Sequence, residues 1–297
     1  MHQRPRTIAL MNQKGGVGKT TTAVHLAAAW AAQRKRTLLI DLDPQAHATL
    51  SLGIDAETLD RSVFDVLGAE AGAEEVIIER SPDLDVLPAT TDLAAAEHEL
   101  ASANERHFRL ARALEAVRDR YDMITIDCPP SLGLLTLNGL AAAGEVLIPM
   151  QAHFLALQGV GKLLETVAAV AQRVNPSLLV TGVVLCMHDE QARHTREVVA
   201  DMRAFFDSQR EQPVPWRDAL VFQPTIRRNI KLAESPSFGQ TAFEYDPSCA
   251  GAKDYAALAE CVAMSVPVTP ENDVDSPSGQ VELETKPAAD PHRRATA

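Results

Sequence analysis

Near the start of the chain, eight residues have the types and spacing of a phosphate-binding loop. They occupy positions 14–21 and read Lys-Gly-Gly-Val-Gly-Lys-Thr-Thr. Glycines allow a tight turn that points several backbone N–H groups at one anion. In such a loop the Lys19 ammonium contacts the β- and γ-phosphates of a nucleotide, and the Thr20 hydroxyl binds Mg²⁺. The residue types therefore predict a site for a nucleoside triphosphate with magnesium.

The loop departs from the general G-x-x-x-x-G-K-[ST] pattern at its start. Gln13 stands at the first glycine position, and Lys14 adds a second lysine. Two lysines facing one triphosphate are more positive charge than a single site usually carries. The alternative interpretation of the loop is a plain glycine turn between a strand and a helix. The acidic residues described next weigh against that alternative.

Aspartates follow two apolar segments further along the chain. Residues 37–43 read as a buried strand ending in Asp41 and Asp43, and residues 121–131 contain a strand ending in Asp127. Parallel sheets bind ligands at the carboxyl ends of their strands. In a phosphate-loop ATPase, an aspartate placed like Asp127 holds magnesium through water. Simple strand-end capping is the alternative for Asp41 and Asp43, and their place one βα unit after the loop favours a functional role.

The loop and the aspartates need a frame of strands and helices. An apolar run at 7–11 precedes the loop and an Ala-rich segment at 22–30 follows it, which is the strand–loop–helix context of a phosphate loop. We expect further strands at 84–88, 145–151 and 178–186, and helices at 62–67, 92–117, 157–173, 191–206 and 253–264. This order predicts a single α/β domain with a mainly parallel central sheet flanked by helices.

Composition sets broad limits on the class of protein. Of 297 residues, 46% are apolar but only 4% aromatic, so the core should be aliphatic, which suits a buried parallel sheet. The net charge of −12 argues against a generally cationic nucleic-acid binder, although charge can be local. The four cysteines form no C-x-x-C pair, so we expect a reduced cytoplasmic protein without a zinc site. No apolar run approaches the ~20 residues that span a bilayer. Because the first strand begins almost at once, we expect no signal peptide.

The loop and later motifs together resemble the ParA/MinD family of ATPases, which have a deviant Walker A loop. The K-G-G-x-G-K-[ST] form at 14–20 and D-x-D-P-Q-x-x-A-T at 41–49 are similar to the ParA-type signatures. Residues 127–131 are similar to the family's second nucleotide motif, and 221–239 to the C-terminal segment of chromosomal, Soj-like ParA proteins. The resemblance covers residues 6–264.

The resemblance implies a P-loop ATPase that binds MgATP and dimerises face to face across two nucleotides. Lys14 would reach the nucleotide of the partner, Gly15 would stay small because the facing loops pack closely, and Asp43 would orient the attacking water. The implied catalytic residues are Lys14, Lys19 and Asp43. The implied metal residues are Thr20, Asp41 and Asp127. The implied nucleotide-binding residues are Lys14, Gly15, Gly16, Val17, Gly18, Lys19, Thr20 and Thr21.

The resemblance also implies that the ATP-bound dimer binds double-stranded DNA without sequence preference, through charge and counterion release. The implied DNA-binding residues are Arg227, Arg228, Lys231, Arg196 and Lys253. Arg227 stands where the family has proline, which raises the local charge, and a solvated basic helix end is the alternative. A ParB-like centromere-binding protein would stimulate hydrolysis, and chromosome or plasmid copies would be segregated at the nucleoid. Cys186 and His188 differ from the family's commoner residues at a strand end beside the adenine base.

Two further expectations concern the tail and the rival functions. Residues 1–265 should form the ATPase domain, and 266–297 an acidic, Pro-rich, disordered tail. The tail is not the basic amphipathic helix that a MinD-like membrane anchor needs. The alternatives are a MinD-like or other positioning ATPase acting on a membrane or protein cargo, an iron–sulfur reductase or cluster carrier on the same fold, and a nucleotide-gated scaffold without catalysis.

Overall fold

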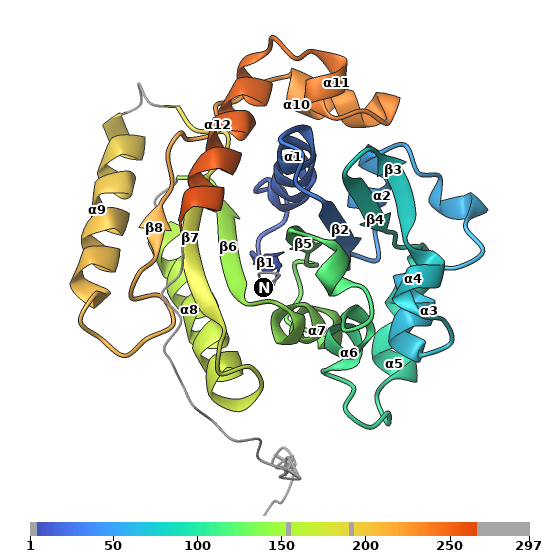
Figure 1. Cartoon of the computed structure of the whole chain (residues 1–297). Coiled ribbons are helices and arrows are strands. Elements are labelled where there is room, and N and C mark those ends of the chain that lie inside the picture. Colours follow the sequence, from blue (N-terminus) through green and yellow to red (C-terminus); the bar gives the residue numbers. More distant parts are fainter. Residues whose placement is uncertain (1–4, 153–155, 190–192, 266–297) are drawn as a thin grey trace, which may run out of the picture.

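The computed structural model describes residues 5–152, 156–189 and 193–265. These residues form one sheet with the strand order β3-β4-β2-β5-β1-β6-β7-β8 (Figure 1). The strands are β1 (Arg6–Leu10), β2 (Thr37–Asp41), β3 (Ile78–Ser81), β4 (Leu84–Leu87), β5 (Met123–Asp127), β6 (Glu145–Met150), β7 (Leu179–Leu185) and β8 (Leu220–Val221). Every neighbouring pair is parallel except β3 and β4. The expected mainly parallel sheet is confirmed.

Helices cover both faces of the sheet (Figure 1). They are α1 (Lys19–Ala32), α2 (His47–Ser51), α3 (Val63–Gly68), α4 (Ala73–Val76), α5 (Ala96–Glu99), α6 (Arg109–Leu114), α7 (Leu134–Ala142), α8 (Ala156–Arg173), α9 (Arg193–Gln209), α10 (Lys231–Glu234), α11 (Ala242–Tyr245) and α12 (Ala250–Met264). Short 3₁₀ helices occupy Ala56–Thr58, Thr91–Ala95, Arg118–Arg120 and Ser235–Phe238.

Successive residues of the central strands pack in two separate hydrophobic cores. Ile8 and Leu10 of β1 pack with α1 and α12, whereas Ala9 between them packs in the core that includes α6, α7 and α8. This follows from the two-residue period of a strand, which points neighbouring side chains to opposite faces. Strands β2 and β5 are buried along their whole length, and apart from a threonine and the final aspartate each strand is apolar.

The expectation of one helix over 92–117 is wrong. The chain instead forms the turn Thr91–Ala95, then α5, then irregular turns before α6 begins at Arg109. The Asn138 side chain of α7 accepts a hydrogen bond from the Leu110 N–H at 3.1 Å and donates to the Arg106 carbonyl at 2.8 Å. In a continuous helix the Leu110 N–H would donate to the Arg106 carbonyl, but here both groups form hydrogen bonds with this buried amide. Strands β3 and β8 were not expected, because β3 is half exposed and β8 has only two residues.

The remaining predicted elements are present with shifts of a few residues at their ends. The expected strands at 7–11, 37–43, 84–88, 145–151 and 178–186 correspond to β1, β2, β4, β6 and β7. Residues 191–192 of an expected helix, and the predicted tail at 266–297, lie outside the described residues. None of the helices in the described part of the chain is long and apolar enough to cross a bilayer.

Candidate nucleotide-binding site

The glycine loop joins the carboxyl end of β1 to the first turn of α1, near the middle of the sheet. Gly16 and Gly18 have φ angles of +70° and +95°, a left-handed conformation that glycine adopts without steric cost. The N-terminus of α1 therefore faces the loop, and its unpaired N–H groups add partial positive charge there. The loop thus has the backbone geometry of an anion site.

Two polar side chains anchor the loop to the end of β6. The Asn12 amide donates to the Pro149 carbonyl at 2.8 Å, and its oxygen accepts from the Lys14 N–H at 3.0 Å. The Gln151 amide donates to the Gly16 carbonyl at 3.1 Å. Sequence reasoning missed Asn12 and Gln151 as loop supports. The available signal was their position directly after two apolar strands, at the edge where parallel strands bind ligands.

Lys19 is the first residue of α1, directly after the loop, and only 7% of its surface is exposed. Its ammonium is 3.4 Å from the Lys14 carbonyl oxygen. Burial lowers the pKa of Lys19, and the nearby carboxylates of Asp127 and Asp43 oppose that shift. The lysine is therefore held between the loop backbone and the acidic strand ends, where it can contact the phosphates of a bound nucleotide.

Asp127 ends β5 and is completely buried. Within the described part of the chain, neither of its carboxylate oxygens has a well-formed hydrogen bond. Burial and the charge of Asp41 raise the pKa of Asp127 well above its ordinary value, while Thr20 and Lys19 lower it. A buried carboxylate that has no well-formed hydrogen bond among the described residues and lies beside the Thr20 hydroxyl fits a divalent cation, because hard cations prefer oxygen ligands. The residues present therefore suit magnesium.

Asp41 lies opposite Asp127 in the register of the neighbouring strand β2, but its carboxylate is occupied. One oxygen accepts from the Asp43 N–H at 3.1 Å, and the other from the N–H and hydroxyl of Thr49 at 2.9 and 2.8 Å. Burial raises the pKa of Asp41 to about 6 despite these bonds. Asp41 thus holds the segment after β2 in place. Asp43, only 9% exposed, accepts from the Gln45 N–H at 3.0 Å.

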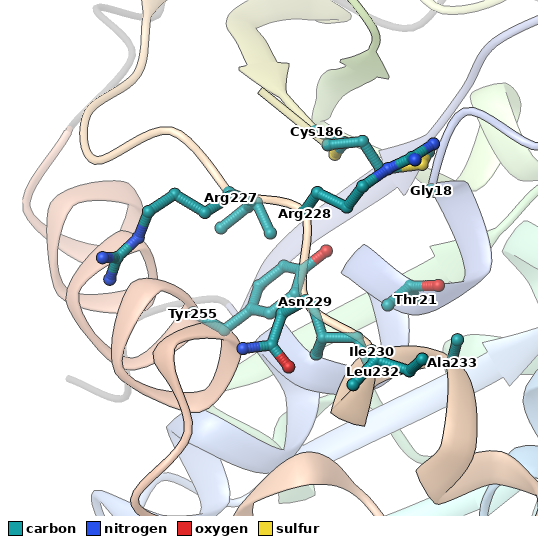
Figure 2. Close-up of a pocket in the computed structure, with 12 residues that line it drawn as sticks. Gly18, Thr21, Cys186, Arg227, Arg228, Asn229, Ile230, Leu232, Ala233 and Tyr255 are labelled. Carbon is teal, nitrogen blue, oxygen red and sulfur yellow. The ribbon is translucent and has the colours of Figure 1, made fainter. Parts of the chain in front are cut away.

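A pocket of about 430 Å³ continues from the loop along the start of α1 (Figure 2). Its walls come from the loop and α1, from the end of β7, from the segment 226–233 and from α12. Cys186 closes one side, because its Sγ lies 3.1 Å from where a Cβ on Gly18 would stand. The Tyr255 and Thr22 hydroxyls are 3.0 Å apart and tie α12 to α1. The pocket can take the nucleoside part of a ligand whose phosphates lie on the loop.

The basic residues expected to bind DNA have different surroundings. Arg227 extends away from the pocket and pairs with Asp254 of α12 at 2.7 Å, whereas Arg228 extends toward Gly18 and Cys186 (Figure 2). Lys231 pairs with Glu234 at 2.9 Å. Two of the three neighbouring cations are thus compensated by carboxylates, so the local charge is lower than residue counting indicates.

Lys253 and Arg196 complete the expected set. Lys253 is exposed at the start of α12 and Arg196 is exposed on α9. Among the described residues, neither of them forms an ion pair. The structure therefore does not bring the five expected basic residues into a single cluster of unpaired charge.

Comparison with known proteins identifies the family. The profile of a family described as an AAA domain matches residues 5–180. The sporulation initiation inhibitor protein Soj of Bacillus subtilis is 44% identical over 261 residues, which cover 88% of this chain and 99% of Soj. The chain belongs to the ParA/Soj family. The chromosome partitioning protein ParA of Myxococcus xanthus is 42% identical over 271 residues, covering 91% of this chain and 92% of that protein.

A solved structure shares both the fold and the sequence similarity. Cobyrinic acid a,c-diamide synthase from Mycobacterium smegmatis, with bound ADP and magnesium, aligns with a TM-score of 0.73 at 36% identity. The alignment covers 87% of this chain and 94% of that one. The chromosome-partitioning ATPase Soj of Treponema pallidum is 42% identical over 256 residues, which cover 86% of this chain and 95% of that protein. The family therefore supports a ParA-like partitioning role.

Proposed function

We propose that this chain hydrolyses MgATP and that its ATP-bound dimer binds double-stranded DNA without sequence preference. The observation that carries the nucleotide part is the buried Asp127 carboxylate, which has no well-formed hydrogen bond to any described residue and lies beside Thr20 and Lys19. The bound ADP and magnesium of the Mycobacterium smegmatis structure support the same assignment. Hydrolysis stimulated by a ParB-like protein would release the dimer, and repeated cycles would segregate chromosome or plasmid copies at the nucleoid in the cytoplasm.

In this proposal the chain positions groups and neutralises charge. Thr20 and Asp127 would hold Mg²⁺, which neutralises charge on the phosphates when bound. The N–H groups of residues 15–21 and the Lys19 ammonium bind the phosphates, and Lys14 of a second subunit adds charge across the interface. Asp43 orients the attacking water, and Asp41 keeps Asp43 in place through the bond to its N–H. Since no strong general base is present in this scheme, intrinsic turnover should be slow.

The basic residues of the proposed DNA-binding face differ in how available their charge is to phosphates. Lys253 and Arg228 are exposed and, within the described residues, have no carboxylate partner, so they are available to phosphates. Arg227 and Lys231 would have to share their charge with Asp254 and Glu234. Arg228 also borders the nucleotide pocket, so its substitution can change both ATP and DNA binding.

The decisive experiment measures duplex DNA binding with ATP, with ADP and without nucleotide, at two salt concentrations. We expect ATP-dependent binding that weakens with salt, and its loss in Lys14→Ala and Lys253→Glu. Arg228→Glu is run with a parallel ATP-binding measurement that separates the two effects. Arg173→Glu, an exposed charge reversal at the end of α8, is the control and should bind like wild type.

Absence of DNA binding in every nucleotide state, with ATP hydrolysis intact, would contradict the DNA part of the proposal. The result would favour a MinD-like or other positioning ATPase with a protein cargo. Absence of MgATP binding itself would contradict the whole proposal.

A further inference from the structure

The segment that follows β2 contains a completely buried threonine, Thr49, in the short helix α2. Before this helix the chain makes a tight turn, in which the Ala46 N–H donates to the Asp43 carbonyl at 2.8 Å. Ala46 has a φ angle of +52°, a left-handed conformation that a residue with a Cβ adopts only at a cost. The backbone does not favour this turn by itself, so side-chain contacts must help to hold it.

The Thr49 hydroxyl joins the ends of two neighbouring strands, β2 and β4. Its oxygen lies 2.8 Å from a carboxylate oxygen of Asp41, the last residue of β2, and 3.0 Å from the N–H nitrogen of Ala89, which follows β4. Because the Ala89 N–H can only donate, the hydroxyl oxygen accepts there and its single proton goes to Asp41. The chemistry of the groups therefore determines the direction of both hydrogen bonds.

These bonds fix the orientation of the Asp41 carboxylate. The hydroxyl and the N–H of Thr49 both donate to Oδ2 of Asp41, which leaves Oδ1 to accept from the Asp43 N–H at 3.1 Å. The charge of Asp43 acts in turn on Lys19, which follows the glycine loop. A continuous chain of hydrogen bonds therefore leads from Ala89 through Thr49 and Asp41 to Asp43, beside the proposed phosphate site.

The hydroxyl has no substitute in this arrangement. Thr49, Asp41 and Ala89 are all completely buried, so water cannot replace a lost bond without a change in the structure. Valine has the shape of threonine without the hydroxyl. At position 49 it would leave the Ala89 N–H without its acceptor and Asp41 with one donor fewer. The two backbone N–H groups would still hold the Asp41 carboxylate, but less firmly.

We propose that Thr49 is a positioning residue for ATP hydrolysis, which holds Asp43 through Asp41. This inference rests on the proposed function, in which the Asp43 carboxylate orients the attacking water. Thr49 affects the reaction only through these two aspartates. Displacement of a reacting group by about 1 Å can slow a reaction by about 100-fold, so a buried hydroxyl at this distance from the chemistry can control its rate.

The test compares wild type, Thr49→Val and Thr49→Ser in the full-length protein. MgATP affinity is measured by equilibrium titration, and hydrolysis in a single turnover at protein concentrations that complete ATP-dependent dimerisation. Thr49→Val should bind MgATP within about threefold of wild type but hydrolyse it roughly 10- to 100-fold more slowly, because the lost contact orients the water and not the nucleotide. Thr49→Ser keeps the hydroxyl and should hydrolyse ATP at close to the wild-type rate.

Thr181→Val is the matched control for a simple loss of stability. The Thr181 hydroxyl is also buried and donates to a carboxylate, that of Glu145 at 2.6 Å, but at the amino ends of β6 and β7. Both valine variants should have a lower melting temperature, and Thr181→Val should keep the wild-type hydrolysis rate. An equal loss of rate in the two variants would overturn the proposal. If Thr49→Val does not fold, Thr49→Cys, with a weak donor in place of the hydroxyl, is compared with Thr49→Ser in the same way.

A second arm asks whether Thr49 acts through Asp43. Hydrolysis is measured for Asp43→Asn and for the double variant with Thr49→Val. If the two residues act as one unit, Thr49→Val should slow hydrolysis much less in the Asp43→Asn protein than in wild type. The same loss in both backgrounds would show that Thr49 acts by another route.

The two proposals fail in different ways. Wild-type hydrolysis by Thr49→Val, with Asp43→Asn inactive, would overturn the positioning role and leave the proposed function standing. Loss of MgATP binding in a folded Thr49→Val protein would also overturn it, because Thr49 would then act on the nucleotide. Wild-type hydrolysis by Asp43→Asn would overturn the role of Asp43 in the proposed function, and the role of Thr49 with it.

Discussion

Asp127 is a buried carboxylate, and burying its charge destabilises the folded protein. On our proposal, a bound cation offsets this destabilisation. Because burial and Asp41 raise the pKa of Asp127, its charged form destabilises the nucleotide-free protein at neutral pH. We predict that Asp127→Asn increases the free energy of unfolding without nucleotide, because the amide carries no charge to bury. The same variant should lose the rise in melting temperature that MgATP causes in wild type. Urea denaturation at pH 7.5 and thermal melts with MgATP measure the two effects.

Asp92→Asn is the control for this prediction, because Asp92 is exposed and lies outside the site. It should change neither quantity. A less stable Asp127→Asn protein, or one that MgATP still stabilises fully, would contradict the role given to Asp127.

His25 is a buried histidine that the structure keeps neutral. Its Nδ1–H donates to the Thr21 carbonyl at 2.7 Å, and its Nε2 accepts from the Ala242 N–H at 3.0 Å. Burial lowers the pKa of His25 to about 4 from its ordinary 6.5. As pH falls, the unfolded chain therefore binds this proton before the folded protein does. The stabilisation from neutral His25 is complete above pH 6.5 and is lost between pH 6.5 and about 4.

We therefore predict that wild type loses about 3 kcal/mol of stability relative to His25→Gln between these pH values. The raised pKa of Asp41 acts in the opposite direction over an overlapping range, but it is common to both proteins and cancels in the difference. Denaturation curves at several pH values give the difference, with exposed His98→Gln as the control. A pH-independent difference would show that His25 titrates normally.

At the scale of elements, one ion pair fastens the wall of the nucleotide pocket to α12. The Arg227 side chain donates two hydrogen bonds to Asp254, at 3.0 and 2.7 Å, and the Arg227 N–H donates a third at 3.1 Å. Only 7% of the Asp254 side chain is exposed. Loss of either partner leaves the other charge poorly compensated, and the segment from Ile226 to Asn229 then loses its attachment to α12.

We predict a coupling free energy of about 1–3 kcal/mol from a double-mutant cycle of Arg227→Ala and Asp254→Ala. The Arg36–Asp122 pair is a matched control, because it also has two side-chain hydrogen bonds but is about half exposed on both sides. Its coupling should stay below about 1 kcal/mol. Equal coupling in the two pairs would show that burial of Asp254 adds nothing. We also expect weaker ATP binding in both single variants at Arg227 and Asp254.

At the scale of the whole molecule, Gly15 is required for the proposed dimer but not for the folding of one subunit. A Cβ built on Gly15 meets no atom within 4 Å, and Gly15 is not among the glycines with positive φ. Nothing in the described part of one subunit therefore requires a glycine at this position. The proposed dimer does require one, because two loops would face each other there.

We predict that Gly15→Val keeps the unfolding free energy of the monomer within about 0.5 kcal/mol of wild type and abolishes ATP-dependent dimerisation. Light scattering after size exclusion, with and without ATP, measures the association state. Gly144→Val is the control. A Cβ on Gly144 also meets no atom within 4 Å, but Gly144 directly precedes β6, at the end of that strand away from the glycine loop. A Gly15→Val protein that still dimerises with ATP would contradict the face-to-face arrangement.

The sequence by itself determined the fold class and the position of the loop. Apolar runs ending in Asp41 and Asp127 predicted strands whose carboxyl ends share one edge, and the glycines after the first strand predicted the turn into α1. These features are local, because a buried strand must be apolar and a left-handed turn favours glycine. The mainly parallel sheet is confirmed, whereas the roles of the site residues stay predictions.

Only the tertiary structure decided which side chains meet. Asn138 interrupts the expected helix over 92–117 from α7, and Asp254 compensates Arg227 from α12. Thr49 bonds to Ala89 because β2 and β4 are neighbours in the sheet. Such contacts join residues that are far apart in the sequence, so composition and local spacing do not predict them. They depend on the order of strands in the sheet, which packing of the whole chain decides.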